Sequence, residues 1–304
     1  MRDSVVHNVS YFFHFREDPT INASSQSINI QRAAAALFAT AEFREKVCTG
    51  QLPAEKVGRK ETRLCSTAYK YMFNACRIPY KEQDSYHIYD PSRFSHAVVA
   101  RKGHFFSIDI VDKSGDPLPV SVIEGQLQKC VDIANSLPSS RPKLGVLTSI
   151  NRDSWAKMRE RLIESGGKKM EKALEKLQSG AIVLNLDNEE PVSRKDCAVL
   201  FLSGGLNSGH NRWFDKSINL MVANNGRAAL IGEHSMMDGM PLVRYADYVT
   251  NVTYKDAIER SAQLSCESSP QVYDIFADIF EEMDSSVLEK AETEGMFNFS
   301  ILFL

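Results

Sequence analysis

The sequence has no run of 18 or more apolar residues, so it predicts no membrane-spanning helix. Its first residues contain neither an apolar signal-peptide core nor an arginine-rich presequence, and its last three are not a peroxisomal address. We therefore expect an intracellular protein without a visible targeting signal. The formal charge of −3 over 304 residues lacks the basic surplus of nucleic-acid-binding proteins, which argues against a nucleic-acid partner.

Cysteine is sparse and scattered. The six cysteines form no C-x-x-C pair, so no zinc cluster or other metal site is predicted, and we expect buried reduced thiols. They are Cys48, Cys65, Cys76, Cys130, Cys197 and Cys266. The Gly-rich stretch 203–209 lacks both a P-loop lysine and the G-x-G-x-x-G order, so it predicts a surface connection rather than a phosphate cradle.

Apolar periodicity predicts helices interleaved with strands. Helices are expected at 30–47, 66–74, 120–137, 153–165, 168–178, 242–258 and 270–293. Strands are expected at 94–100, 104–110, 181–186, 217–223 and 227–232. This order predicts an α/β fold, a mixed β-sheet flanked by helices.

The most informative segment is 232–239, Gly-Glu-His-Ser-Met-Met-Asp-Gly. Two apolar runs precede it, and Asn225-Gly226 between them is a strong hairpin signal because both residues tolerate positive φ. The second strand would present His234 at its tip. Gly239 and Pro241 are expected to break the backbone before the next helix.

His234 and Asp238 form a candidate proton-transfer pair. An imidazole exchanges a proton near neutral pH, and a carboxylate nearby can orient the ring and stabilise its charged form. The sequence therefore predicts His234 as a general base with Asp238 as its partner. The H-x-x-x-D spacing also occurs by chance, and an ordinary surface or core histidine is the alternative interpretation.

Several further segments, in the same order and with similar spacing, resemble the choline/carnitine acyltransferase family, and within it carnitine O-acetyltransferases of the fungal type. The matching stretches are 71–79 (Tyr-Met-Phe-Asn-Ala-Cys-Arg-Ile-Pro), 146–156 (Val-Leu-Thr-Ser-Ile-Asn-Arg-Asp-Ser-Trp-Ala), 211–216 (Asn-Arg-Trp-Phe-Asp-Lys) and 225–239. Their joint occurrence is far more specific than H-x-x-x-D-G alone.

The resemblance implies a function and a site. It implies reversible acetyl transfer between coenzyme A and carnitine, with His234 as the catalytic base and Asp238 as its partner. It implies carnitine and acyl-CoA as substrates, with coenzyme A as a co-substrate rather than a permanently bound cofactor. No partner protein is indicated. By family the location would be mitochondrial or peroxisomal, and the fold would be that of the family's N-terminal domain.

The resemblance covers 1–294, and 295–304 is expected to be a non-family tail. The family's N-terminal aromatic stretch and its second half are not seen, so we expect a chain truncated at both ends that is inactive alone. A catalytically silent fragment is the alternative function. An unrelated H-x-x-x-D acyltransferase of the chloramphenicol-acetyltransferase kind is a third, disfavoured by the four ordered segments.

Other residues of these segments have structural interpretations. Arg77 is expected to tie helices together rather than touch substrate. Trp155 and Trp213 are expected to anchor the core. Asp215 and Lys216 are expected to form a local ion pair.

Overall fold

The structure is a computed structural model that describes residue 2 and residues 10–205, 209–264 and 270–301, the last six of these by backbone alone. Its centre is a seven-stranded mixed sheet in the order β1-β10-β9-β8-β6-β7-β11. In that order, the strands span Tyr11–His14, Ala228–Gly232, Ile218–Val222, Val183–Leu186, His96–Arg101, His104–Asp109 and Tyr273–Asp274. β6, β8 and β9 are parallel and the remaining pairs are antiparallel, which confirms the predicted mixed α/β sheet.

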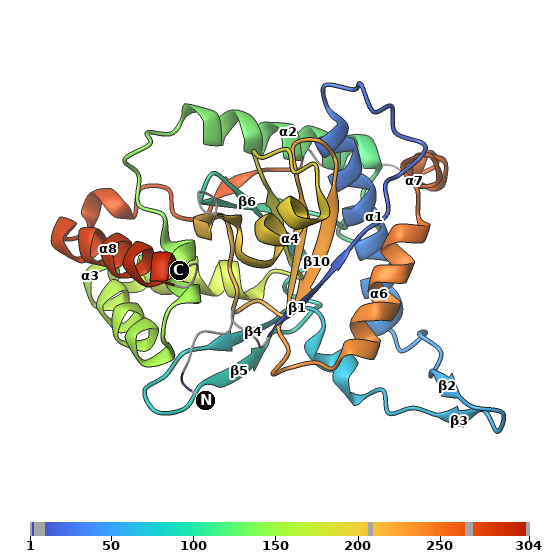
Figure 1. Cartoon of the computed structure of the whole chain (residues 1–304), viewed down its shortest axis with the longest axis horizontal. Helices are drawn as coiled ribbons and strands as arrows, with labels where there is room; N and C mark the ends of the chain where they lie inside the picture. The colour runs from blue at the N-terminus through green and yellow to red at the C-terminus, as the bar shows by residue number, and fades with distance from the viewer. Residues whose placement is uncertain (1, 3–9, 206–208, 265–269, 302–304) are drawn as a thin grey trace.

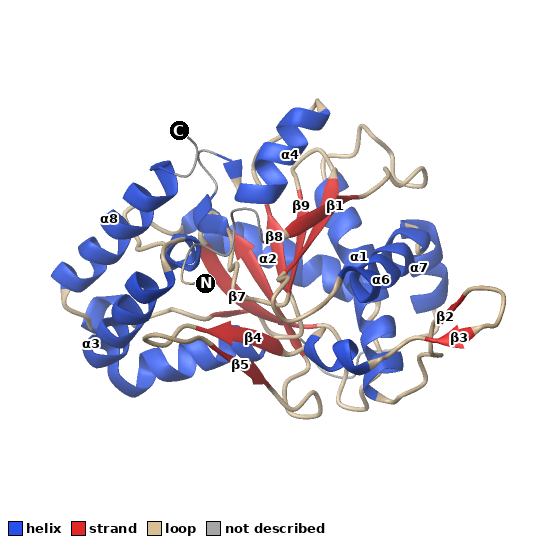
Figure 2. Ribbon diagram, turned by 60° about the horizontal axis from the view of Figure 1, so that its bottom comes forward, coloured by secondary structure: helices blue, strands red, loops and turns tan. Residues whose placement is uncertain are grey.

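Helices cover both faces of this sheet. The first group comprises α1 (Ile28–Cys48), α2 (Val120–Ser136), α6 (Gly239–Asn251) and α7 (Tyr254–Ser261). The second comprises α3 (Arg152–Ser179), α4 (Arg194–Ser203), α8 (Ser285–Ile301) and the 3₁₀ helix η2 (Leu144–Ser149). Figure 2 shows α1, α6 and α7 on one side of the strands and α3 and α8 on the other. Within the part of the chain that the structure describes, no helix combines the length and apolarity needed to cross a membrane.

The two-residue side-chain period of each strand divides the core between the two helix layers. Leu184 and Leu220 belong to the cluster under α1 and α2, whereas Val183 packs toward α3. Met221 belongs to a third cluster, with α4. Because successive side chains of a strand point to opposite faces, near-continuous apolar runs follow from burial on both sides. Trp155 and Trp213 are fully buried with ring centroids 6.0 Å apart, which confirms them as core anchors.

Two small hairpins complete the fold. β2 (Lys56–Val57) pairs with β3 (Thr62–Arg63) and protrudes from the body in Figure 1, while β4 (Ala75–Ile78) pairs with β5 (Ser85–Ile88). The predicted helix at 66–74 is wrong, because only the 3₁₀ helix η1 (Thr67–Tyr71) forms there. The helix ends at its C-cap Met72, and two residues later Asn74 has a φ of 54° and its amide donates to the carbonyls of Phe94 and Ser179.

The predicted helix at 242–258 is two helices. Asp238 caps α6, which begins at Gly239 and accommodates Pro241 in its first turn, where a proline needs no N–H partner. Gly239 and Pro241 therefore start the helix rather than break the chain before it. After Asn251, a capping box between Thr253 and Asp256 starts α7.

The predicted helix at 270–293 is also wrong in its first half. That half forms β11 and the 3₁₀ helix η4 (Phe280–Glu282), and α8 then continues across residue 294, the boundary of the predicted tail. The helices expected at 153–165 and 168–178 form α3, which kinks between them at Gly167, where φ is 53°.

Smaller predictions had mixed outcomes. The hairpin between β9 and β10 is confirmed, but only Gly226 of its turn has positive φ (78°), so the turn is of the three-residue type that ends in a left-handed glycine. The stretch 203–209 ends α4 and begins the 3₁₀ helix η3 (Gly209–Asn211), with 206–208 outside the described residues. Cys48 and Cys65 are exposed rather than buried, and Cys266 lies outside the described residues.

His96 at the start of β6 makes stability depend on pH. Its side chain is buried, and Nε2–H donates to the Lys176 carbonyl at 2.7 Å. Burial, followed by the charge of Lys176, lowers the pKa of His96 to about 3. The stabilising contribution of this neutral ring is complete above its unfolded pKa of ~6.5 and is lost progressively as the pH falls toward 3.

We therefore expect His96→Gln to flatten the acid limb of the stability curve. Between pH 6.5 and 4 the slope of the unfolding free energy against pH should fall by up to ~1.4 kcal/mol per pH unit. This is the slope that results when unfolding takes up one proton. Urea unfolding at several pH values measures the slope. His87→Gln, at an exposed position of β5, is the control and should leave it unchanged. An unaltered slope in His96→Gln would contradict the assignment.

Candidate active site

His234 lies two residues beyond the end of β10, on the orange connection that leads to α6 in Figure 1. Gly232 ends the strand opposite Tyr11 of β1 and Ile218 of β9. A Cβ on Gly232 would lie 1.9 Å from Leu242 Cδ1, so a larger residue here would force the buried Leu242 side chain of α6 to shift. The His234 side chain is 45% exposed, so a solute can reach it.

Asp238 lies beside His234 but does not hydrogen-bond to it. Asp238 Oδ1 and His234 Nε2 are 4.0 Å apart, the outer limit for an ion pair with a protonated ring. The same Oδ1 accepts from the Gly239 N–H at 2.8 Å and caps α6. Among the described residues Asp238 makes no ion pair with an arginine. The i,i+4 spacing therefore brings the two side chains together while Asp238 also serves the helix.

Tyr11 is the third side chain at this site. Its ring meets the His234 ring edge to face, with centroids 4.8 Å apart and planes at 85°. The Tyr11 hydroxyl is buried and has no hydrogen-bond partner in the described part of the chain. Burial, and then the Asp238 charge, raise the pKa of Tyr11 to about 12, so this hydroxyl remains protonated at neutral pH.

A buried carboxylate fixes the loop that carries His234. Glu233, with a fully buried side chain, accepts hydrogen bonds from the Ser235 hydroxyl at 2.6 Å and the Met236 N–H at 3.2 Å. Arg77 of β4 pairs with Glu233 at 3.1 Å, and the Met237 side chain is buried in the core. His234 thus lies between Glu233 and Ser235, which are both held by hydrogen bonds, and this restricts the backbone of His234.

The same network continues into the core. Asp84 pairs with Arg77 at 2.6 Å and with Arg152 at 2.7 Å, and Arg152 pairs with Asp215 at 2.6 Å. Arg77 therefore joins the β4–β5 hairpin to the His234 loop rather than tying helices together. The predicted ion pair between Asp215 and Lys216 is wrong.

The two residues of that predicted pair have other partners. Asp215 binds Arg152 and accepts from Trp155 Nε1 at 2.7 Å, whereas Lys216 Nζ donates to the Gln178 carbonyl at 2.6 Å. The chain turns at 214–215, where the Lys216 N–H donates to the Trp213 carbonyl at 3.0 Å, and each of the two side chains is buried with a partner from a distant segment.

Chemically, the site combines an accessible imidazole with a nearby carboxylate and a protonated phenol. Such a set can accept a proton from a bound hydroxyl or thiol and return it. The sequence predicted His234 and Asp238 as site residues, and the structure places Tyr11, Glu233 and Ser235 beside them, none of which was predicted. The available signal was Glu233 itself, a charged residue directly after a strand of apolar residues, where burial demands a partner.

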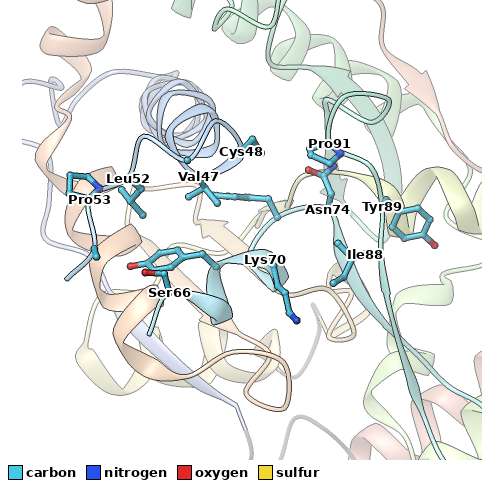
Figure 3. Close-up of a pocket in the computed structure, with 14 residues that line it drawn as sticks. Val47, Cys48, Leu52, Pro53, Ser66, Lys70, Asn74, Ile88, Tyr89 and Pro91 are labelled. Carbon is cyan, nitrogen blue, oxygen red and sulfur yellow. The ribbon is translucent and has the colours of Figure 1, made fainter. Parts of the chain in front are cut away.

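A separate cavity of about 570 Å³ lies between the end of α1, η1 and β5 (Figure 3). Val47 and Leu52 lie on one side of it and Ile88 and Pro91 on the other. Neither a histidine nor a carboxylate is among its described lining residues. Among its described residues this cavity therefore lacks the imidazole and carboxylate that meet at His234. No group of three or more His, Cys, Asp or Glu side chains in the described ranges is placed to hold a metal ion.

Comparison with known proteins gives consistent results. A family model described as Choline/Carnitine o-acyltransferase matches residues 1–294. Over 230 residues, 72% of this chain and 36% of the relative, the chain is 33% identical to a human carnitine O-acetyltransferase. Over 302 residues, 90% of this chain and 43% of the relative, it is 30% identical to a mouse mitochondrial carnitine O-palmitoyltransferase 2. The chain thus spans less than half the length of these relatives.

Proposed function

The chain belongs to the choline/carnitine O-acyltransferase family, and on that premise we propose that it serves in reversible transfer of a short acyl group between coenzyme A and carnitine, with His234 as the general base. The observation that carries this proposal is the placement of His234, accessible at the edge of the sheet on a loop fastened by the buried Glu233. A base needs both access to substrate and a fixed position.

The proposed chemistry needs one proton acceptor. As the carnitine hydroxyl attacks the thioester carbonyl, the neutral imidazole of His234 takes the hydroxyl proton. The C–O bond forms, the C–S bond breaks, and the proton passes to the departing thiolate. In the reverse direction the same imidazole deprotonates the coenzyme A thiol. No acyl-enzyme and no metal is required in this scheme.

We assign Asp238 an electrostatic role. At 4.0 Å its carboxylate favours the imidazolium that forms during transfer, without accepting a hydrogen bond from the ring in the resting structure. Its cap on α6 fixes its own position. Tyr11 packs against the ring and limits its rotation.

The relatives bear the names of both acetyl- and palmitoyl-transferring enzymes, so family membership leaves the chain length of the acyl group open. We propose an acetyl or other short acyl group, a mitochondrial or peroxisomal location, and a family domain over 1–294 followed by a distinct tail.

The test is an assay of thiol release with carnitine and acetyl-, octanoyl- or palmitoyl-CoA. It is applied to the purified chain and to a hybrid in which the chain replaces its matching segment in the human carnitine O-acetyltransferase. We expect little activity from the chain alone and acetyl-CoA-dependent activity in the hybrid. A folded hybrid that transfers no acyl group would favour the catalytically silent alternative, and preference for palmitoyl-CoA would refute the short-chain assignment.

A further inference from the structure

A second polar pocket lies at the edge of the sheet opposite His234. β10 is antiparallel to β9, so His234 lies where β9 begins, whereas the parallel strands β6, β8 and β9 end at the other edge. Lys102 directly follows β6, and Asn188 follows β8, and both line a cavity of about 420 Å³. Ligands of α/β sheets commonly bind outside the carboxyl ends of parallel strands.

The lining brings four basic side chains together from three segments. Lys102 and His104 flank the β6–β7 turn, Lys143 precedes η2, and His210 lies on η3. A Cβ added to Gly103 would lie 2.5 Å from His210 Cδ2 and 2.9 Å from Lys143 Cγ. The turn between the strands is therefore covered directly by these two side chains, and its glycine has φ of 79°.

In the part of the chain that the structure describes, the two lysines of this pocket form no ion pair, although Glu189 also lines it. Among the described residues, neither Lys102 nor Lys143 makes an ion pair or a side-chain hydrogen bond. Neighbouring arginines differ: Arg212 binds Asp187 at 2.7 Å, and Arg141 binds Asp274. The pocket therefore keeps two cationic groups for a ligand.

Three carboxylates lie near the pocket. Glu189 lines it, and its charge, after that of Asp187, opposes the burial that lowers the pKa of Arg101. Glu292 accepts from the backbone N–H of Lys143 at 3.2 Å. Both carboxylate oxygens of Asp187 accept hydrogen bonds from Arg212, and Oδ1 also accepts one from Asn211.

The positive charges around the pocket also affect the pKa values of its two histidines. Burial lowers the pKa of His104 to about 4, helped by Arg141, Lys143 and Lys102 and opposed by Asp274. Burial likewise lowers the pKa of His210 to about 4, helped by Lys143, His104 and Arg212. An anion in the pocket would reverse part of this effect.

From this geometry we propose that the pocket formed by Lys102, Lys143, His104 and His210 binds a small doubly charged anion, the phosphate or dicarboxylate group of a small molecule, at a site separate from His234. The lysines supply charge and N–H donors, and the histidines supply further donors. By linkage, anion binding raises the histidine pKa values, so binding takes up protons as the pH falls.

The test uses sulfate as the probe, because its charge stays constant from pH 5 to 8. Sulfate is titrated into the full 304-residue chain while imidazole NMR signals are followed, assigned with His104→Gln and His210→Gln. We expect saturable shifts of both signals and a dissociation constant raised about fivefold or more by Lys143→Gln or Lys102→Gln. Lys113→Gln, in an exposed turn, is the control and should bind as the parent does.

A second arm varies pH and the chemical class. Affinity for sulfate should rise at least about threefold from pH 7.5 to 5.5, and His210→Gln should reduce that rise. Competition by inorganic phosphate or by succinate identifies the preferred class. Equal sulfate binding by folded Lys143→Gln, Lys102→Gln and Lys113→Gln, or no shift of either imidazole signal, would overturn the proposal.

Discussion

Replacing His234 by alanine is expected to lower kcat for acyl transfer by about 10²–10⁴-fold, the usual contribution of a positioned general base. Without the imidazole, the loop keeps two carboxylates, but Glu233 is buried against Arg77 and Asp238 caps α6. Tyr11 cannot replace the imidazole because its pKa is raised to about 12. KM should change little, since in the proposed mechanism the ring acts on the reacting proton rather than on the bulk of the substrate.

The measurement uses the hybrid enzyme with acetyl-CoA and carnitine. It compares kcat of parent and variant once both have been shown to unfold at the same midpoint. His234 is 45% exposed, so its removal should leave stability nearly unchanged. His87→Ala, at an exposed strand position, is the matched control and should keep parental kcat. Retention of near-parental kcat by a folded His234→Ala enzyme would remove His234 from the mechanism.

Replacing Asp215 by alanine is expected to lower the free energy of unfolding by about 3–5 kcal/mol, the range for breaking a buried ion pair by removing one partner. Asp215 is buried between Arg152 and the indole N–H of Trp155, and the Arg152 side chain is fully buried. The variant would leave a buried guanidinium with Asp84 as its remaining carboxylate, and an indole N–H without an acceptor.

Urea unfolding of the 304-residue chain measures this loss. Asp153→Ala is the matched control, because Asp153 pairs with Arg2 on the surface with a side chain 41% exposed. Such pairs contribute ~0–1 kcal/mol. Similar losses in the two variants would show that burial of the Asp215 network contributes no more than a surface pair. Because Arg152, Asp84 and Arg77 link Asp215 to Glu233, Asp215→Ala should also loosen the His234 loop.

The local sequence pattern was sufficient to predict those helices and strands in which buried residues recur at regular spacing along the sequence. The runs that became β8, β9 and β10 were predictable because strands buried on both faces are apolar along nearly their whole length. The helices α1 and α2 followed from their length and spacing. His234 and Asp238 could be proposed because proton chemistry restricts the residue type and the motif places both within one short segment.

Segments governed by distant contacts were not predictable in the same way. The stretch 66–74 has helical composition, but Asn74 turns the chain to bond Phe94 and Ser179, which lie 20 and 105 residues away. β1, the β4–β5 hairpin and α4 were missed because they are short, and the edge strands among them carry weak alternation. The break between α6 and α7 depends on a two-residue cap rather than on a change in apolar spacing.

By itself, the sequence determined the α/β class, the hairpin that presents the histidine, and the candidate base with its carboxylate neighbour. These depend on residue type and short-range spacing, which a linear pattern contains. Only the tertiary structure decided that Tyr11 packs on His234, that Glu233 is neutralised by Arg77, and that Asp215 pairs with Arg152 rather than Lys216. Those partners lie 223, 156 and 63 residues apart, and their pairing is set by the order of strands in the sheet and by the free-energy cost of burying an unpaired charge.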